Sequence, residues 1–75
     1  MSKILELREK RAKAWEAAKV FLDTKRGNDG LLSTEDTATY ERMEKDVVDL
    51  GKEIERLERQ AAIDAELNNP TSSPL

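Results

Sequence analysis

Apolar residues recur at alternating steps of three and four positions along two stretches of the chain. This repeat, averaging about 3.5 residues, gathers side chains into one stripe of an α-helix, as in coiled coils. The first stripe comprises Ile4, Leu7, Arg11, Ala14, Ala18 and Phe21. The second stripe comprises Tyr40, Met43, Val47, Leu50, Ile54 and Leu57. The pattern predicts one helix over about residues 3–26 and another over about 34–67, with a turn at 27–33.

The segment KRGNDGLLSTED, which separates the two stripes, carries helix stop and start signals in that order. Lys25 and Arg26 place cations at the negative end of a helix dipole, and Gly27 is the expected left-handed residue that ends the first helix. Ser33 stands three residues before Asp36, the spacing of a helix N-cap. These signals favour a hairpin over one continuous rod.

A reversal at this turn brings the two stripes face to face with a nearly constant sum of paired positions. The expected pairs are Phe21 with Tyr40, Ala18 with Met43, Ala14 with Val47, Arg11 with Leu50, Leu7 with Ile54, and Ile4 with Leu57. Small residues then meet larger ones, as close packing requires. The expected fold is an all-α, antiparallel two-helix coiled-coil hairpin. We expect the stem of Arg11 to cover Leu50 while its guanidinium reaches Asp49 or Glu53.

Several apolar residues lie outside these stripes and predict that the hairpin binds further copies of itself. With 75 residues, 37% of them apolar and three aromatic, the chain has little material for an enclosed core. The candidates for self-association are Trp15, Leu22, Ala61, Ile63 and Leu67. For Trp15, capping the side of the hairpin is the alternative role. Gly51, inside the second helix, permits close approach of a neighbouring helix or is a tolerated weak point.

The last eight residues, NNPTSSPL, have a different composition and no burial pattern. Asn and Pro end the helix, and the Ser, Thr and Pro residues that follow are typical of a flexible linker. We therefore expect residues 68–75 to be a disordered tail and the chain to be a piece of a longer protein.

Charge and residue inventory narrow the classes of function. The net charge is −3, but residues 1–26 carry +4 and residues 27–75 carry −7, so the halves attract each other. The acidic second half argues against nucleic acid as a partner. The chain lacks His and Cys, and its carboxylates are scattered, so we expect no catalytic site, cofactor or metal site. No apolar run approaches the roughly 20 residues of a membrane span.

Four segments, taken in their order along the chain, are LREKRAKAWEAAKVFLD, GLLSTED, EIERLERQ and the Asn/Pro/Ser-rich tail. Together they resemble the N-terminal region of tailed-phage major capsid proteins of the HK-ninety-seven-type fold. The resemblance covers nearly the whole chain. In that family the region is the delta domain, a helical built-in scaffold joined by a linker to the capsid shell domain. The shell domain itself is absent from these residues.

The resemblance implies a scaffolding role in procapsid assembly in the host cytoplasm. Its partners would be copies of the same chain and the shell domain, and a phage maturation protease would remove it afterwards. The alternative is a free-standing coiled-coil oligomerisation or adaptor module, which the composition does not distinguish from a scaffold. A nucleic-acid-associated protein is a more distant alternative, with Lys10, Arg11 and Lys13 as its basic residues.

Overall fold

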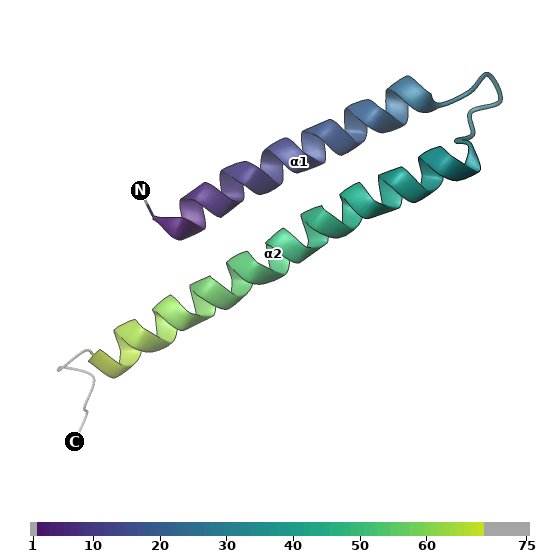
Figure 1. The fold of residues 1–75 in the computed structure, drawn as a ribbon. Helices are drawn as coiled ribbons and strands as arrows, with labels where there is room; N and C mark the ends of the chain where they lie inside the picture. The colour runs from purple at the N-terminus through teal and green to yellow at the C-terminus, as the bar shows by residue number, and fades with distance from the viewer. Residues whose placement is uncertain (1, 69–75) are drawn as a thin grey trace.

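The protein is a hairpin of two antiparallel α-helices, shown by a computed structural model that describes residues 2–68 (Figure 1). Helix α1 spans Lys3–Lys25 and helix α2 spans Thr34–Asn68. The predicted all-α fold with two helices packed against each other is therefore confirmed. The predicted linker began at Asn68, which instead belongs to the last turn of α2; its other residues, 69–75, lie outside the described part of the chain.

Both helices begin with a serine cap. The Ser2 hydroxyl accepts a hydrogen bond from the backbone N–H of Leu5 at 3.1 Å, a cap that was not predicted from the sequence. At α2, the Ser33 hydroxyl accepts from the N–H of Asp36 at 3.1 Å, as the serine-to-acid spacing predicted. Each hydroxyl satisfies a backbone donor that has no partner within the helix.

The turn differs from its prediction in which glycine adopts the left-handed conformation. The prediction for Gly27 is wrong, because Gly30 has the positive φ, 78°. The chain leaves α1 through Arg26 in an extended conformation, with φ −68° and ψ 131°, so no left-handed residue is needed there. It reverses later, where the N–H of Gly30 donates to the Gly27 carbonyl at 2.9 Å. The Arg26 guanidinium also stabilises the turn by donating a 2.7 Å hydrogen bond to the Gly30 carbonyl.

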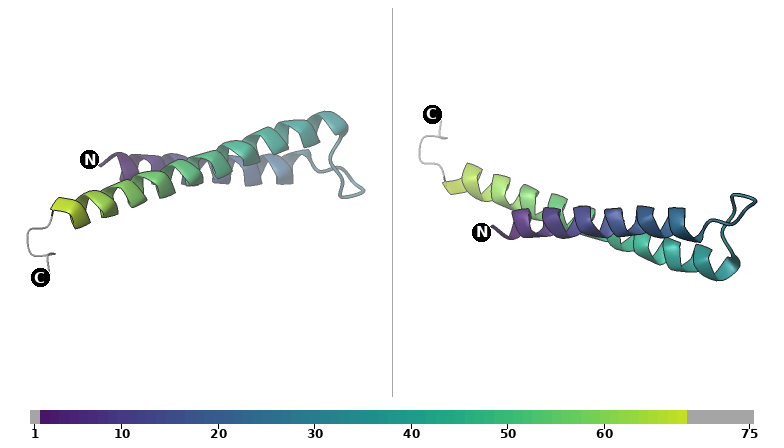
Figure 2. Two further views of the ribbon diagram at one scale, coloured as in Figure 1. Left: turned by 90° about the horizontal axis from the view of Figure 1, so that it is seen from below. Right: turned by 90° about the horizontal axis from the view of Figure 1, so that it is seen from above.

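The core lies along the line where α1 and α2 meet. Its most buried side chains are Ala18, with no exposed surface, and Val47 and Ile54 on α2. Of the other predicted interface residues, only Arg11 is exposed. The half-buried ones are Ile4, Leu7, Ala14, Phe21, Tyr40, Met43, Leu50 and Leu57. The views in Figure 2 show α1 crossing α2 at a shallow angle, which keeps the helices in contact over most of α1.

Helix α2 continues past the start of α1 (Figure 1). All residues from 59 to 68 are exposed. At about 1.5 Å per residue, these ten residues extend about 15 Å. We call residues 59–68 the overhang.

Candidate functional site

A groove of about 800 Å³ runs along one side of the helix pair. We call it the Trp15 groove. It is lined by Arg8, Arg11, Ala12 and Trp15 of α1, and by Glu44, Val47, Val48, Gly51, Ile54, Glu55 and Glu58 of α2. Most of these residues follow one another at steps of three and four within each helix, so they form one row on α1 and one row on α2.

The middle of the Trp15 groove is apolar. Trp15 is 39% exposed and Val48 is 45% exposed, and the buried residues Val47 and Ile54 also line the groove. Trp15 was predicted as a contact residue, with capping of the hairpin's side as the alternative. In the structure it lines an open groove and remains available to a further protein surface.

Arg11 makes a different contact from the one predicted. Its Nε donates a hydrogen bond to the backbone carbonyl of Val47 at 2.9 Å, and its guanidinium lies against the backbone of Gly51. Within residues 2–68, no ion pair of Arg11 with Asp49 or Glu53 is formed. The absence of a side chain at Gly51 leaves room for the guanidinium, which explains the role of this glycine within the hairpin itself.

The two sides of the Trp15 groove carry opposite charges. Helix α1 contributes Arg8 and Arg11, whereas α2 contributes Glu44, Glu55 and Glu58. Arg8 forms an ion pair with Glu58 across the helices, with both side chains largely exposed. Such an exposed pair contributes about 0–1 kcal/mol to stability, so it adds little to the stability of the hairpin.

Tyr40 lies at the turn side of this groove. Its hydroxyl donates a hydrogen bond to the Glu44 carboxylate at 3.0 Å. Partial desolvation raises the pKa of Tyr40, and the hydrogen bond and negative charge of Glu44 raise it further. Elsewhere on α2, the 2.8 Å hydrogen bond between Lys45 and Asp49 raises the pKa of Lys45 and lowers the pKa of Asp49.

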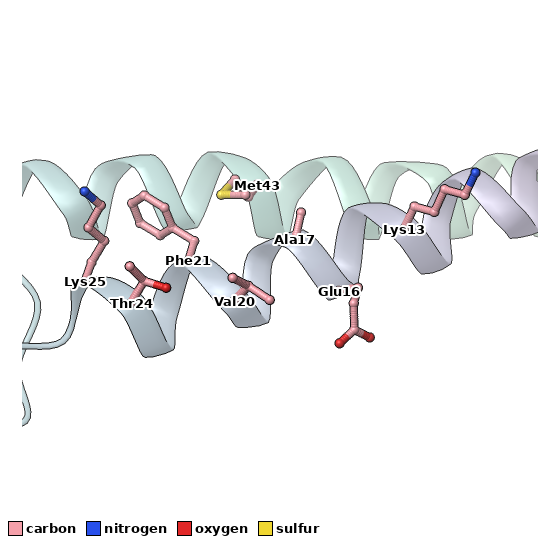
Figure 3. Close-up of a pocket in the computed structure, with 8 residues that line it drawn as sticks. All are labelled: Lys13, Glu16, Ala17, Val20, Phe21, Thr24, Lys25 and Met43. Atoms are coloured by element: carbon pink, nitrogen blue, oxygen red, sulfur yellow. The ribbon is translucent and has the colours of Figure 1, made fainter.

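A second groove, of about 650 Å³, lies near the turn. It is lined by Lys13, Glu16, Ala17, Val20, Phe21, Thr24 and Lys25 of α1 and by Met43 of α2. Figure 3 shows Phe21 reaching toward α2 beside Met43, while Glu16 points away from α2. Phe21 and Met43 therefore act in the pairing of the helices.

The predicted self-association residues fall in three separate places. Trp15 lines its groove, and Leu22 is half-buried near the end of α1. The other three, Ala61, Ile63 and Leu67, lie on the exposed overhang. Ala61 continues the interface stripe of α2, but Ile63, two residues later, is rotated by about 200° and faces the opposite side. Ile63 and Leu67, 53% and 75% exposed, share that outer face.

Sequence reasoning did not identify Val48 or the acidic row of α2 as parts of one surface with Trp15. A detectable signal was present, because Glu44, Val48, Gly51, Glu55 and Glu58 repeat the same three-and-four spacing as the interface stripe. This second stripe was hidden because only two of its members lack a charge.

Within the described residues, no group of three or more Asp or Glu side chains is placed to hold a metal ion. No helix formed by residues 2–68 has the length and apolar character needed to cross a bilayer.

Comparison of the chain with protein-family models, with curated proteins and with solved structures finds no significant match.

Proposed function

We propose that this hairpin is a built-in scaffolding domain of a tailed-phage major capsid protein. It guides procapsid assembly in the host cytoplasm by binding weakly to copies of itself and to the shell domain. A phage protease removes it when the procapsid matures. The resemblance of its helical segments to delta domains supports the capsid context, and the shape of the hairpin supports self-association.

The observation that carries the proposal is the set of apolar side chains that the hairpin leaves exposed. Within residues 2–68, only three apolar side chains form the buried core, whereas Trp15, Val48, Ile63 and Leu67 remain exposed. Burying such side chains against a second copy of the chain removes apolar surface from water, which favours association.

Weak contacts suit a scaffold because wrongly joined subunits must be able to separate during assembly. Exposed apolar residues occur in the Trp15 groove, as Trp15 and Val48, and on the overhang, as Ile63 and Leu67. Small contacts repeated over many subunits give a strong assembly through multivalency, while each single contact stays reversible.

Self-association is tested first, by sedimentation equilibrium of the 75-residue chain over a wide concentration range. We expect a reversible rise in average mass with concentration. A chain that stays monomeric throughout the range would contradict the proposal.

The scaffolding role itself is tested in the phage, by deleting residues 3–68 from the protein that contains them. We expect electron microscopy to show aberrant shells or unassembled subunits instead of closed procapsids. Normal procapsids after the deletion would exclude a scaffold. If the gene encodes no shell domain and the chain still self-associates, the free-standing oligomerisation or adaptor module explains the hairpin instead.

A further inference from the structure

The Trp15 groove has one basic wall and one acidic wall, with apolar side chains between them. Arg8 lies on the α1 wall, and Lys19 continues the same row at the spacing of Arg8, Ala12 and Trp15. The α2 wall carries Glu44, Glu55 and Glu58, and both walls enclose Trp15 and Val48. A surface with this pattern is complementary to a copy of itself placed so that the walls exchange.

We propose that the Trp15 groove binds the same groove of a second copy of this chain, about a two-fold axis parallel to the long axis of the hairpin. The result is a four-helix bundle in which α1 of each copy packs on α2 of the other. The inference rests on the self-association in the proposed function and assigns it a surface and a symmetry.

Charge selects this axis from the two arrangements that a symmetric face-to-face dimer allows. A two-fold axis along the hairpin places each basic α1 row over the partner's acidic α2 row. An axis across the hairpin, in the plane of the interface, places α1 over α1 and α2 over α2. The second arrangement brings Glu44, Glu55 and Glu58 against a like-charged row, which disfavours it.

The same axis fixes which residues meet. Rotation about the long axis leaves positions along that axis unchanged, so each α1 residue meets on the partner the α2 residues that flank it in its own chain. Trp15 therefore packs on the partner's Val48, and Arg8 lies over the partner's Glu55. Trp is among the residues that most often dominate the binding energy of a protein interface.

A charge at Trp15 tests the surface. We expect Trp15→Glu to raise the dimer dissociation constant at least about tenfold in sedimentation equilibrium, because it removes the central anchor. The matched control is Val20→Glu, also on α1. Val20 is 56% exposed and does not line the Trp15 groove. The dimer dissociation constant of this control variant should stay unchanged. Circular dichroism of both variants checks that the hairpin is intact. Equal effects of the two substitutions would overturn the assignment.

Exchanged charges test the symmetry. Arg8→Glu and Glu55→Arg each place like charges opposite one another in a homodimer, so each variant alone should dimerise less than the unmodified chain. An equimolar mixture should form heterodimers as tightly as the unmodified chain forms homodimers. In the heterodimer, residue 8 of each copy faces a residue 55 of opposite charge on the other copy. Within each variant chain, residues 8 and 55 have the same charge. A mixture that dimerises no better than its components would overturn the proposed axis.

These outcomes separate the inference from the proposed function. If the unmodified chain dimerises and none of the groove substitutions weakens the dimer, self-association stands and the Trp15 groove is not its surface. If the unmodified chain is monomeric at every concentration, self-association and the groove assignment both fail.

Discussion

Arg11 shows how a charged residue can occupy a position in an otherwise apolar helix interface. Its aliphatic stem lies at the interface, while its guanidinium bonds to the Val47 carbonyl and covers the bare backbone of Gly51. A Cβ at residue 51 would lie only 2.7 and 2.8 Å from guanidinium atoms. Because those atoms are the end of a flexible side chain, they can move aside without a shift of the backbone.

This contact predicts a coupling between residues 11 and 51. Gly51→Ala gains about 1 kcal/mol of helix propensity but displaces the guanidinium and its hydrogen bond, worth about 0.5–1.5 kcal/mol. We expect little net change in the free energy of unfolding of the unmodified chain. In an Arg11→Ala background, the same substitution should stabilise by about 1 kcal/mol. Urea unfolding of the four chains measures the coupling, and equal effects of Gly51→Ala in both backgrounds would argue against the contact.

At the level of the elements, the helices are defined by their ends and by the turn between them. Ser2 and Ser33 cap the two N-termini through their hydroxyls. In the turn, the N–H of Gly27 donates to the Leu31 carbonyl and Gly30 takes the left-handed conformation. The two glycines therefore have different roles, although both interrupt the helical pattern.

The difference predicts unequal effects of alanine at the two glycines. Gly30→Ala should lower the free energy of unfolding by about 1–2 kcal/mol, because an L-residue is strained at φ 78°. Gly27→Ala should have a smaller effect, because the φ of Gly27 is not left-handed. The added Cβ would lie 3.3 Å from the Asp29 carboxylate, a flexible side chain that needs to move by only a few tenths of an ångström. Thermal unfolding followed by far-ultraviolet circular dichroism compares them. A larger loss from Gly27→Ala would show that the reversal occurs at Gly27.

The whole molecule is long and thin, with principal extents of 67 × 22 × 15 Å. A pair of helices encloses little volume, and within residues 2–68 only Ala18, Val47 and Ile54 form the buried apolar core. Such a hairpin is marginal alone, and the proposed association with a copy of itself would add stability through mass action.

Stability that depends on association predicts a concentration-dependent melting temperature. A tenfold change in concentration corresponds to about 1.4 kcal/mol of free energy per dimer. Each tenfold increase above the dimer dissociation constant should therefore stabilise each chain by about 0.7 kcal/mol. We expect the melting temperature of the unmodified chain to rise across a dilution series measured by circular dichroism. The Trp15→Glu variant should show the same rise only at concentrations at least about tenfold higher, because its dimer dissociation constant is raised by that factor. A constant melting temperature for the unmodified chain would mean that the hairpin is stable as a monomer.

Periodicity and local signals in the chain were sufficient for the two helices, the hairpin and the cap at Ser33. These features depend on neighbouring residues, and the spacing of apolar side chains is itself a property of the sequence. The same spacing, followed beyond the main stripe, also contains the row that begins at Glu44 and passes through Val48. It was not recognised because charged residues outnumber the apolar ones in it.

Packing in three dimensions decided the remaining features. Arg11 had acidic side chains and a backbone carbonyl within reach, and the space above Gly51 selected the carbonyl of Val47. Gly27 and Gly30 were equally able to adopt a left-handed conformation, and the folded turn has it at Gly30, whose N–H donates to the Gly27 carbonyl. Local preference thus determined that the chain forms two helices and turns between them. Contacts between residues far apart in the sequence determined what Arg11 binds and which exposed side chains share a surface, because those outcomes depend on the final distance between the helices.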